Sequence, residues 1–276
     1  MMARTLQMTN KMRKLARKQL VAEWLPTGSE GPYEVRRFEI TKEGAEEYNA
    51  QMARSENAWA RTRRVFPGMH TGLFEPEMGV DPWMSDTPAE VLDHYDVMIQ
   101  MMQRGGRILI NGLGLGMITA FAARLPNVTH VDVVELQGDI IKLVGPHLPE
   151  RHKVTVHHAS AYDIAWNDER WDVAWHDIWP TITPDNLPDM DRLEAKYADR
   201  VNHQETWVRA ECEQAAEQDA QWLSTVDAQL RVKYAPGTPA EAVELRLVRA
   251  VAKEFGVSEA KVIEAATKAW GRKENG

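Results

Sequence analysis

Two hydrophobic periodicities alternate along the middle of the chain. Short apolar runs typical of buried strands are separated by segments whose apolar residues recur with the spacing of a helix. The pattern predicts strands over 107–111, 130–135, 153–158 and 171–176, and helices over about 116–125 and 137–145. Alternation of this kind predicts an α/β fold with a mostly parallel sheet and right-handed crossovers. Ligands of such sheets bind beyond the carboxyl ends of the strands.

The segments on either side have different patterns. Before the alternating region we expect a strand over 33–40, a helix that Thr41 caps and that runs to about Arg64, a loop with short strand candidates over 69–84, and a helix from Ser85 to about Gln103. After Pro180 we expect one or two long polar helices over 189–223, a weak strand candidate over 229–234, and a helical pair over 239–255 and 258–270. Either the sheet is shortened, or helices replace its far edge.

These changes of pattern predict three regions. We expect residues 1–84 to form an N-terminal basic helix with a small strand and helix region, 85–235 an α/β core with a helical extension, and 236–276 a C-terminal helical hairpin.

Composition narrows the class of protein. The 276-residue chain is 43% hydrophobic and 27% charged, which is typical of globular domains. No apolar run reaches the length of a membrane span, the start has no secretory pattern, and Cys212 is the single cysteine, so we expect a cytoplasmic protein. The net charge of −8 argues against wholesale nucleic-acid binding. The sequence leaves the oligomeric state open, a homo-oligomer included.

A glycine-rich loop follows the first strand of the alternating region. Asn111 ends that strand, and Gly112, Gly114 and Gly116 lead into a helix. Glycine lets a ligand approach bare backbone, and the first amides of the helix can face a nucleotide-like group. Glu135 ends the next strand, about 20 residues on, where a carboxylate reaches ribose hydroxyls. Met117 stands where a dinucleotide fingerprint would have its third glycine, so the spacing favours another nucleoside cofactor.

This arrangement resembles the class I S-adenosylmethionine-dependent methyltransferases over about residues 85–180, nearest their spermidine-synthase-like branch. The resemblance implies a Rossmann-like core and S-adenosylmethionine as cofactor. It implies that the cofactor is bound by a set of residues at the strand ends, namely Asn111, Gly112, Gly114, Gly116, Glu135, Leu136, Ser160, Ala161 and Asp177. Ser160 stands where the family has an aspartate that bonds the adenine amino group.

The segment from Asp177 to Pro180 resembles the acid and aromatic loops of amine methyltransferases. It implies that Asp177 is catalytic, as an acceptor or base toward the acceptor molecule, and that Trp179 binds this substrate. Cofactor contact or backbone capping is an equal alternative for Asp177, and core packing is an alternative for Trp179. Aminopropyltransferases have a second acid where this chain has Pro180. They also have a Tyr-His-Glu run before the first strand, which this chain lacks, although Asp93-His94-Tyr95-Asp96 lies near that position.

Three functions therefore remain open. The first is an S-adenosylmethionine-dependent methyltransferase whose acceptor, small or macromolecular, is unknown and for which an amine is one candidate. The second is a catalytically impaired cofactor-binding or interaction module, and the third is an aminopropyltransferase. The histidines follow no metal-ligand spacing, so we expect no metal site. Two segments give weak support for nucleic acid as a partner: the basic residues 1–22 and a helix-turn-helix-like pattern near Gly256.

Overall fold

The structure is a computed structural model that describes residues 22–55, 58–75, 81–233, 252–253, 258 and 260–261. The chain divides into two compact units between Glu211 and Cys212, and each unit is described by itself. The basic segment before residue 22 and nearly all of the helical hairpin expected over 236–276 lie outside the described residues. The described part of the second unit is mostly the continuation of helix α9 (Arg209–Lys233).

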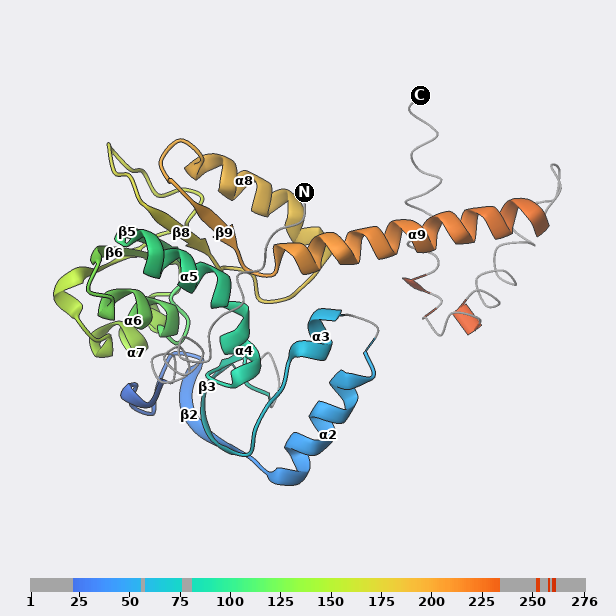
Figure 1. Cartoon of the computed structure of the whole chain (residues 1–276), viewed down its shortest axis with the longest axis horizontal. Coiled ribbons are helices and arrows are strands. Elements are labelled where there is room, and N and C mark those ends of the chain that lie inside the picture. Colours follow the sequence, from blue (N-terminus) through green and yellow to red (C-terminus); the bar gives the residue numbers. More distant parts are fainter. Residues whose placement is uncertain are drawn as a thin grey trace. The chain divides into compact units, whose positions relative to one another are not determined.

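The first unit contains a parallel sheet with five strands among the described residues (Figure 1). Its strands lie in the order β7-β6-β5-β8-β9, and every neighbouring pair is parallel. The bounds are β5 (Gly106–Asn111), β6 (Val128–Glu135), β7 (Val154–His158), β8 (Val173–His176) and β9 (Gln204–Thr206). The first four match the four strands that the sequence predicts, and the α/β class is confirmed.

Alternation along the strands divides the sheet into two faces. Ile108, Ile110, Val131 and Val133 belong to a core that also contains residues of α5, α6 and α7. The helices are α5 (Tyr95–Arg104), α6 (Met117–Arg124) and α7 (Gly138–Val144). Tyr197, on α8 (Leu187–Tyr197), packs against the opposite face. Helices on both faces therefore leave the carboxyl ends of the strands as the open edge, as expected for a parallel sheet.

The far edge of the sheet differs from the expectation. The sequence predicts one or two long helices over residues 189–223, but α8 ends at Tyr197 and the short strand β9 pairs with β8 before α9 begins. A strand of three residues carries too little periodicity to be recognised, and its pairing depends on β8. The strand candidate over 229–234 is wrong for residues 229–233, which are helical in α9.

A second, antiparallel sheet precedes the parallel one. It contains β1 (Gly28–Glu30), β2 (Tyr33–Ile40), β3 (Gly68–Phe74) and β4 (Met84–Ser85), in that order. The helix expected from Thr41 to about Arg64 begins as predicted, with the Thr41 hydroxyl accepting the Gly44 amide at 3.0 Å. It ends early, however, and divides into α2 (Lys42–Ala53) and α3 (Ala58–Thr62). The Asn49 side chain bonds both backbone groups of Val65, which brings the returning chain back against α2.

The helix expected from Ser85 to about Gln103 is also two helices. Ser85 belongs to β4, and α4 (Pro88–Asp93) begins at the proline that signals a helix start. The interruption falls at His94, whose Nδ1 lies 3.0 Å from the Glu90 carbonyl oxygen. In a continuous helix that carbonyl would accept the His94 amide, so the side-chain bond replaces the backbone bond. The kink places the His94 ring at the carboxyl edge of the sheet.

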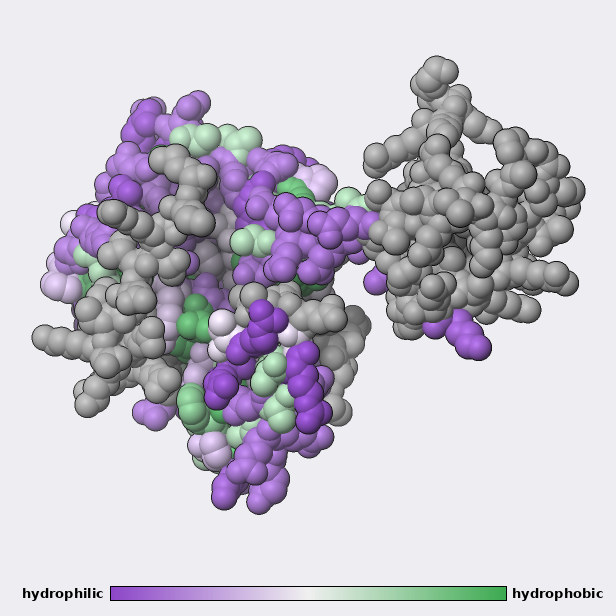
Figure 2. Space-filling model, turned by 45° about the vertical axis from the view of Figure 1, so that its right-hand side comes forward, coloured by the Kyte–Doolittle hydropathy of each residue, from purple (hydrophilic) through white to green (hydrophobic). Residues whose placement is uncertain are grey.

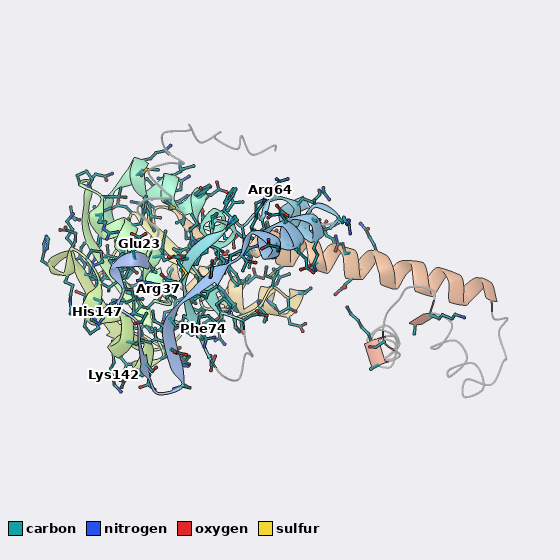
Figure 3. The ribbon with its side chains drawn as sticks, turned by 90° about the horizontal axis from the view of Figure 1, so that it is seen from below. Glu23, Arg37, Arg64, Phe74, Lys142 and His147 are labelled. Atoms are coloured by element: carbon teal, nitrogen blue, oxygen red, sulfur yellow. The ribbon has the colours of Figure 1, made fainter. Side chains whose placement is uncertain are left out.

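Arg37 of β2 holds the first described turn, η1 (Ala22–Trp24), against the antiparallel sheet. It donates to the carbonyl oxygens of Glu23 and Leu25 at 3.1 and 2.9 Å, and Glu23 and Arg37 are labelled in Figure 3. The surface of the described residues is mostly hydrophilic in the view of Figure 2. None of the helices that the structure describes combines the length and apolarity that a membrane span needs.

Candidate functional site

The loop after β5 is shaped by its three glycines. Gly112, Gly114 and Gly116 have φ values of 101°, 49° and 72°, a region that residues with a Cβ rarely adopt. A Cβ on Gly112 would overlap the Asp177 carbonyl oxygen, so Gly112 also permits the close approach of the chain after β8. Gly116 stands at the N-terminus of α6. The predicted strand, glycine loop and helix are therefore confirmed, and the loop exposes backbone at the end of the central strand.

Glu135 is fixed beside this loop at the end of β6. Its side chain accepts the Leu113 amide at 2.8 Å and the Gln137 amide at 2.7 Å, and the residue is 7% exposed. A carboxylate has about four acceptor positions, so two remain for a ligand. Glu135 thus joins the glycine loop to the start of α7. It presents an oriented acceptor to the space beyond the carboxyl ends of the strands.

A cavity of about 510 Å³ opens at these strand ends. Its lining includes Asp177 and six of the other predicted cofactor residues, namely Gly112, Gly114, Glu135, Leu136, Ser160 and Ala161. Leu136 is 61% exposed and belongs to this lining, so its apolar side chain is accessible to a ligand in the cavity. The loop that contains Ser160 and Ala161 is held from α8, where Tyr197 donates its hydroxyl to the Ala161 carbonyl at 3.0 Å. The volume lies within the range of small-molecule and cofactor sites.

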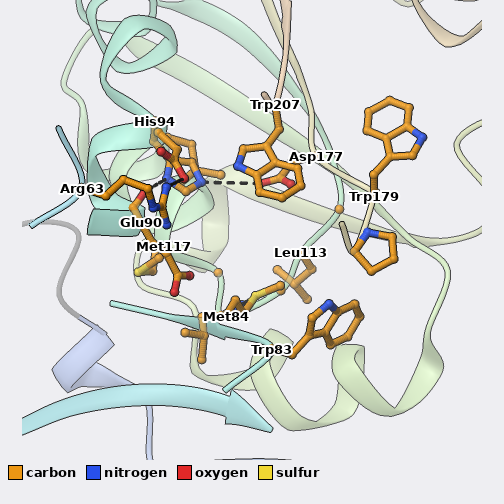
Figure 4. A pocket seen from close by; sticks show the side chains of 17 residues that line it. Arg63, Trp83, Met84, Glu90, His94, Leu113, Met117, Asp177, Trp179 and Trp207 are labelled. Atoms are coloured by element: carbon orange, nitrogen blue, oxygen red, sulfur yellow. Dashed lines mark hydrogen bonds and ion pairs between the residues drawn. The ribbon is translucent and has the colours of Figure 1, made fainter. Parts of the chain in front are cut away.

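A second cavity, of about 200 Å³, adjoins the first (Figure 4). The two share lining residues from three parts of the chain: Trp83, Met84, Gly112, Gly114, Asp177, Trp179 and Pro180. The second cavity adds Trp207 and a charged group that comprises Arg63, Glu90, Asp93 and His94. Asp177 therefore faces both cavities, whereas Glu135 faces only the larger one.

His94 and Asp177 form an ion pair in the second cavity. His94 Nε2 lies 3.5 Å from Asp177 Oδ2, and the side chains are 11% and 27% exposed. Burial lowers the pKa of His94, but the Asp177 and Asp93 carboxylates outweigh it and raise this pKa above its ordinary value of 6.5. A carbonyl oxygen only accepts, so His94 Nδ1 must carry a proton toward Glu90, and Nε2 is the nitrogen that gains or loses one.

Glu90 is a second titrating group of this cavity. Its carboxylate accepts the Ser85 amide and the Ser85 hydroxyl, each at 2.6 Å. Burial raises the pKa of Glu90 to about 7, although the Ser85 bonds and the Arg63 charge oppose the rise. Arg63 is itself paired with Asp93. The cavity thus combines three tryptophan side chains with a carboxyl group whose pKa is about 7 and a histidine whose pKa is raised.

Met84 lies directly on the glycine loop. Its sulfur accepts the Leu115 amide at 3.2 Å, and a Cβ on Gly114 would overlap that sulfur. The antiparallel sheet thus contributes a side chain to the site through β4. A ligand that approached the bare backbone at Gly114 would contact this thioether first.

The structure places most of the predicted cofactor residues around the two cavities, and Asn111 is the exception. Asn111 is fully buried and lines neither cavity, because its amide nitrogen contacts His176 Nδ1 at 2.7 Å below the strand ends. Burial lowers the pKa of His176 to about 4, and its Nε2 contacts Gln204 at 3.1 Å, so this histidine is a neutral bridge between strands. Trp175 is buried in the core, whereas Trp179 lines both cavities.

Sequence reasoning missed most of the second cavity. His94 stood in the Asp93-His94-Tyr95-Asp96 run that was compared with the family, but its place was hidden inside an expected continuous helix. Trp207 follows β9, which lies in a segment whose pattern predicts helix. Trp83 and Met84 lie in the segment 69–84, for which the pattern predicts a loop with short strands and gives no sign of a site. Among the described residues, no group of three or more histidine, cysteine, aspartate or glutamate side chains is arranged to hold a metal ion.

The chain resembles known proteins in parts of its structure only. No protein-family model matches the chain, and no curated protein matches it in sequence. Several solved structures match part of it. An rRNA methylase from Streptococcus thermophilus is 15% identical, with a TM-score of 0.30, over 41% of this chain and 64% of that one.

Two further solved structures match at a similar level. The methyltransferase domain of a bacterial Hen1 protein is 13% identical, with a TM-score of 0.30, over 38% of this chain and 55% of that one. The cyclase SpnF is 20% identical, with a TM-score of 0.30, over 38% of this chain and 39% of that one. The chain thus spans less than two thirds of each of these three proteins, and no activity transfers from them at this similarity.

Proposed function

We propose that the chain is an S-adenosylmethionine-dependent methyltransferase whose acceptor is an amine. The observation that carries the proposal is the pairing of the glycine loop with Glu135 at the mouth of the larger cavity. The carboxylate is already oriented by two backbone amides, and the glycines beside it have no side chain of their own. This combination suits a nucleoside with free ribose hydroxyls and an amino-acid tail.

The residues of the larger cavity fit this cofactor. Glu135 would accept from the ribose hydroxyls, Leu136 would contact the adenine face, and Ser160 would donate or accept at the adenine edge. The glycine loop would receive the amino-acid end. When bound, S-adenosylmethionine supplies an electrophilic methyl group on a sulfonium. The residues that this chain contributes then bind and orient the acceptor, so that positioning provides much of the rate.

The smaller cavity supports an amine as the acceptor. Asp177 faces both cavities, which suits a group that bonds an acceptor beside the reacting methyl group. Tryptophan faces attract cations, and Trp83, Trp179 and Trp207 all line this space. A carboxylate among aromatic side chains is the chemistry that recognises an ammonium group.

Calorimetric titration with S-adenosylmethionine tests the cofactor, with NAD as the competitor that the glycine spacing disfavours. Leu136→Ser should weaken S-adenosylmethionine binding severalfold without affecting folding, because Leu136 is exposed and lost apolar contact costs about 1 kcal/mol or more. Met69→Ser is the matched control, since Met69 is 63% exposed and lines neither cavity. Stronger binding of NAD, or equal losses in both variants, would contradict the proposal.

Isotopic methyl transfer to small amines and to cell extracts tests the reaction. Binding without any transfer would favour the alternative of a catalytically impaired cofactor-binding module. Transfer of an aminopropyl group from decarboxylated S-adenosylmethionine to putrescine would favour the third function.

A further inference from the structure

His94 has a geometry that the proposed methyltransferase function leaves unexplained. Nδ1 is committed to the Glu90 carbonyl, so only Nε2 is free to exchange a proton with the cavity. Nε2 lies 3.5 Å from Asp177 Oδ2, longer than a normal hydrogen bond. When Nε2 is unprotonated, two acceptors converge on the same small space. A donor with at least two N–H groups satisfies both at once.

The charged groups around His94 come from each element packed against it. Asp177 follows β8, Glu90 and Asp93 lie on α4, and Arg63 follows α3 and pairs with Asp93. Trp175 contacts the ring at a centroid distance of 5.6 Å and contributes no charge. Asp177 is the carboxylate that contacts Nε2 directly and has the larger effect on its protonation, and Asp93, which is paired with Arg63, adds a smaller effect in the same direction.

We propose that His94 Nε2 removes the proton from an ammonium acceptor, while Asp177 holds the same nitrogen through a second N–H. The proposal rests on the methyltransferase function and assigns the acceptor-side base, which is distinct from Asp177. An alkylamine has a pKa near that of lysine, about 10, and reaches the site as an ammonium ion without a lone pair. A site that methylates amines must therefore remove one proton first.

The atoms and electrons balance in two events. One ammonium proton passes to neutral His94 Nε2, which becomes an imidazolium, and the amine regains its lone pair. That lone pair forms the new N–C bond with the methyl group of a sulfonium donor, whose C–S bond breaks with both electrons left on sulfur. The methylated ammonium product leaves, and the imidazolium returns its proton to solvent. Only the unprotonated form of His94 can begin this sequence.

Nuclear magnetic resonance of the histidine rings tests the proposal without any cofactor. The probe is benzylamine, because the cavity volume of about 200 Å³ somewhat exceeds that of an engineered cavity of about 150 Å³ that binds benzene. Benzyl alcohol is the uncharged control of the same size. The His94 signal is identified by its loss in His94→Gln. His157→Gln is the matched control, since His157 also contacts an aspartate, Asp132 at 3.1 Å, but lines neither cavity.

Benzylamine should lower the pKa of His94 by roughly one unit or more, because a like charge within a few ångströms disfavours the imidazolium. Benzyl alcohol should leave the pKa unchanged. In Asp177→Asn the pKa of His94 should be lower before any addition, and benzylamine should then have little effect. Equal shifts with both probes, no shift with benzylamine, or an unaltered pKa in Asp177→Asn would overturn the proposal. Failure of S-adenosylmethionine to bind in calorimetry would instead overturn the proposed function and leave this amine site standing.

Discussion

Glu90→Gln should stabilise the protein at alkaline pH and leave it nearly unchanged at acid pH. Burial raises the pKa of Glu90 from 4.5 to about 7 in the folded state. The folded protein therefore binds more protons than the unfolded chain between these values, and stability falls as the pH rises through this window. Each pKa unit is worth about 1.4 kcal/mol, so above pH 7 the ionised carboxylate costs about 3 kcal/mol.

Glutamine removes that cost without leaving its neighbours unpaired. Its carbonyl oxygen can accept the Ser85 amide, and its NH₂ group can donate to the Ser85 hydroxyl. That hydroxyl already lies 3.0 Å from the Thr87 hydroxyl, which then accepts its proton. After a loss of about 1 kcal/mol for the exchanged hydrogen bonds, we expect a net gain of about 2 kcal/mol.

The measurement is urea unfolding of the full chain at pH 5.5 and pH 8.5. The free energy of unfolding of Glu90→Gln should exceed that of the unmutated protein by about 2 kcal/mol at pH 8.5. The two values should be nearly equal at pH 5.5, where an ionisation cost of about 1 kcal/mol balances the loss from the exchanged hydrogen bonds. Glu39→Gln on β2 is the control for the change in net charge, because Glu39 is exposed. An equal effect of Glu90→Gln at both pH values, or a larger loss at pH 8.5, would refute the reasoning that burial governs this carboxyl group.

Other variants test the loop, the acceptor side and the sheet. Gly112→Ala should destabilise the protein much more than Gly114→Ala in thermal unfolding, because the first Cβ meets the backbone at Asp177 and the second meets the movable Met84 side chain; similar losses would contradict this. Asp177→Asn should lower methyl-transfer turnover far more than calorimetric cofactor affinity, since an amide preserves size but carries no charge and accepts through only one oxygen; equal losses would make Asp177 a cofactor ligand. Asp132→Asn should cost about 3–5 kcal/mol in urea unfolding, because this buried carboxylate accepts from Arg107 and Trp171 at 2.7 and 2.8 Å. Although burial raises its pKa, these bonds outweigh that effect and lower it, so the stability that Asp132 contributes should fall away as the pH drops below its ordinary value of 3.8.

Local signals were sufficient for the centre of this protein. The runs that became β5, β6, β7 and β8 are long enough, and apolar enough, for their periodicity to be read directly. The glycine loop could be recognised because positive φ values restrict residue type at those positions whatever surrounds them. Glu135 could be predicted from its distance along the chain. A helix and a strand of ordinary length after the glycine loop bring the end of that strand back beside the loop.

Tertiary structure decided the features in which distant segments meet. β9 is a polar strand of three residues that exists through its pairing with β8, so no local pattern predicts it. The kink at His94 arises because its side chain, in place of its backbone amide, donates to the Glu90 carbonyl. The same local sequence is compatible with a kinked or a continuous helix. His94 meets Asp177 only because the helix before β5 and the end of β8 converge at one edge of the sheet. The sequence thus determined the cofactor-side loop, whose constraints are local, whereas packing between elements far apart in the chain determined the acceptor-side cavity.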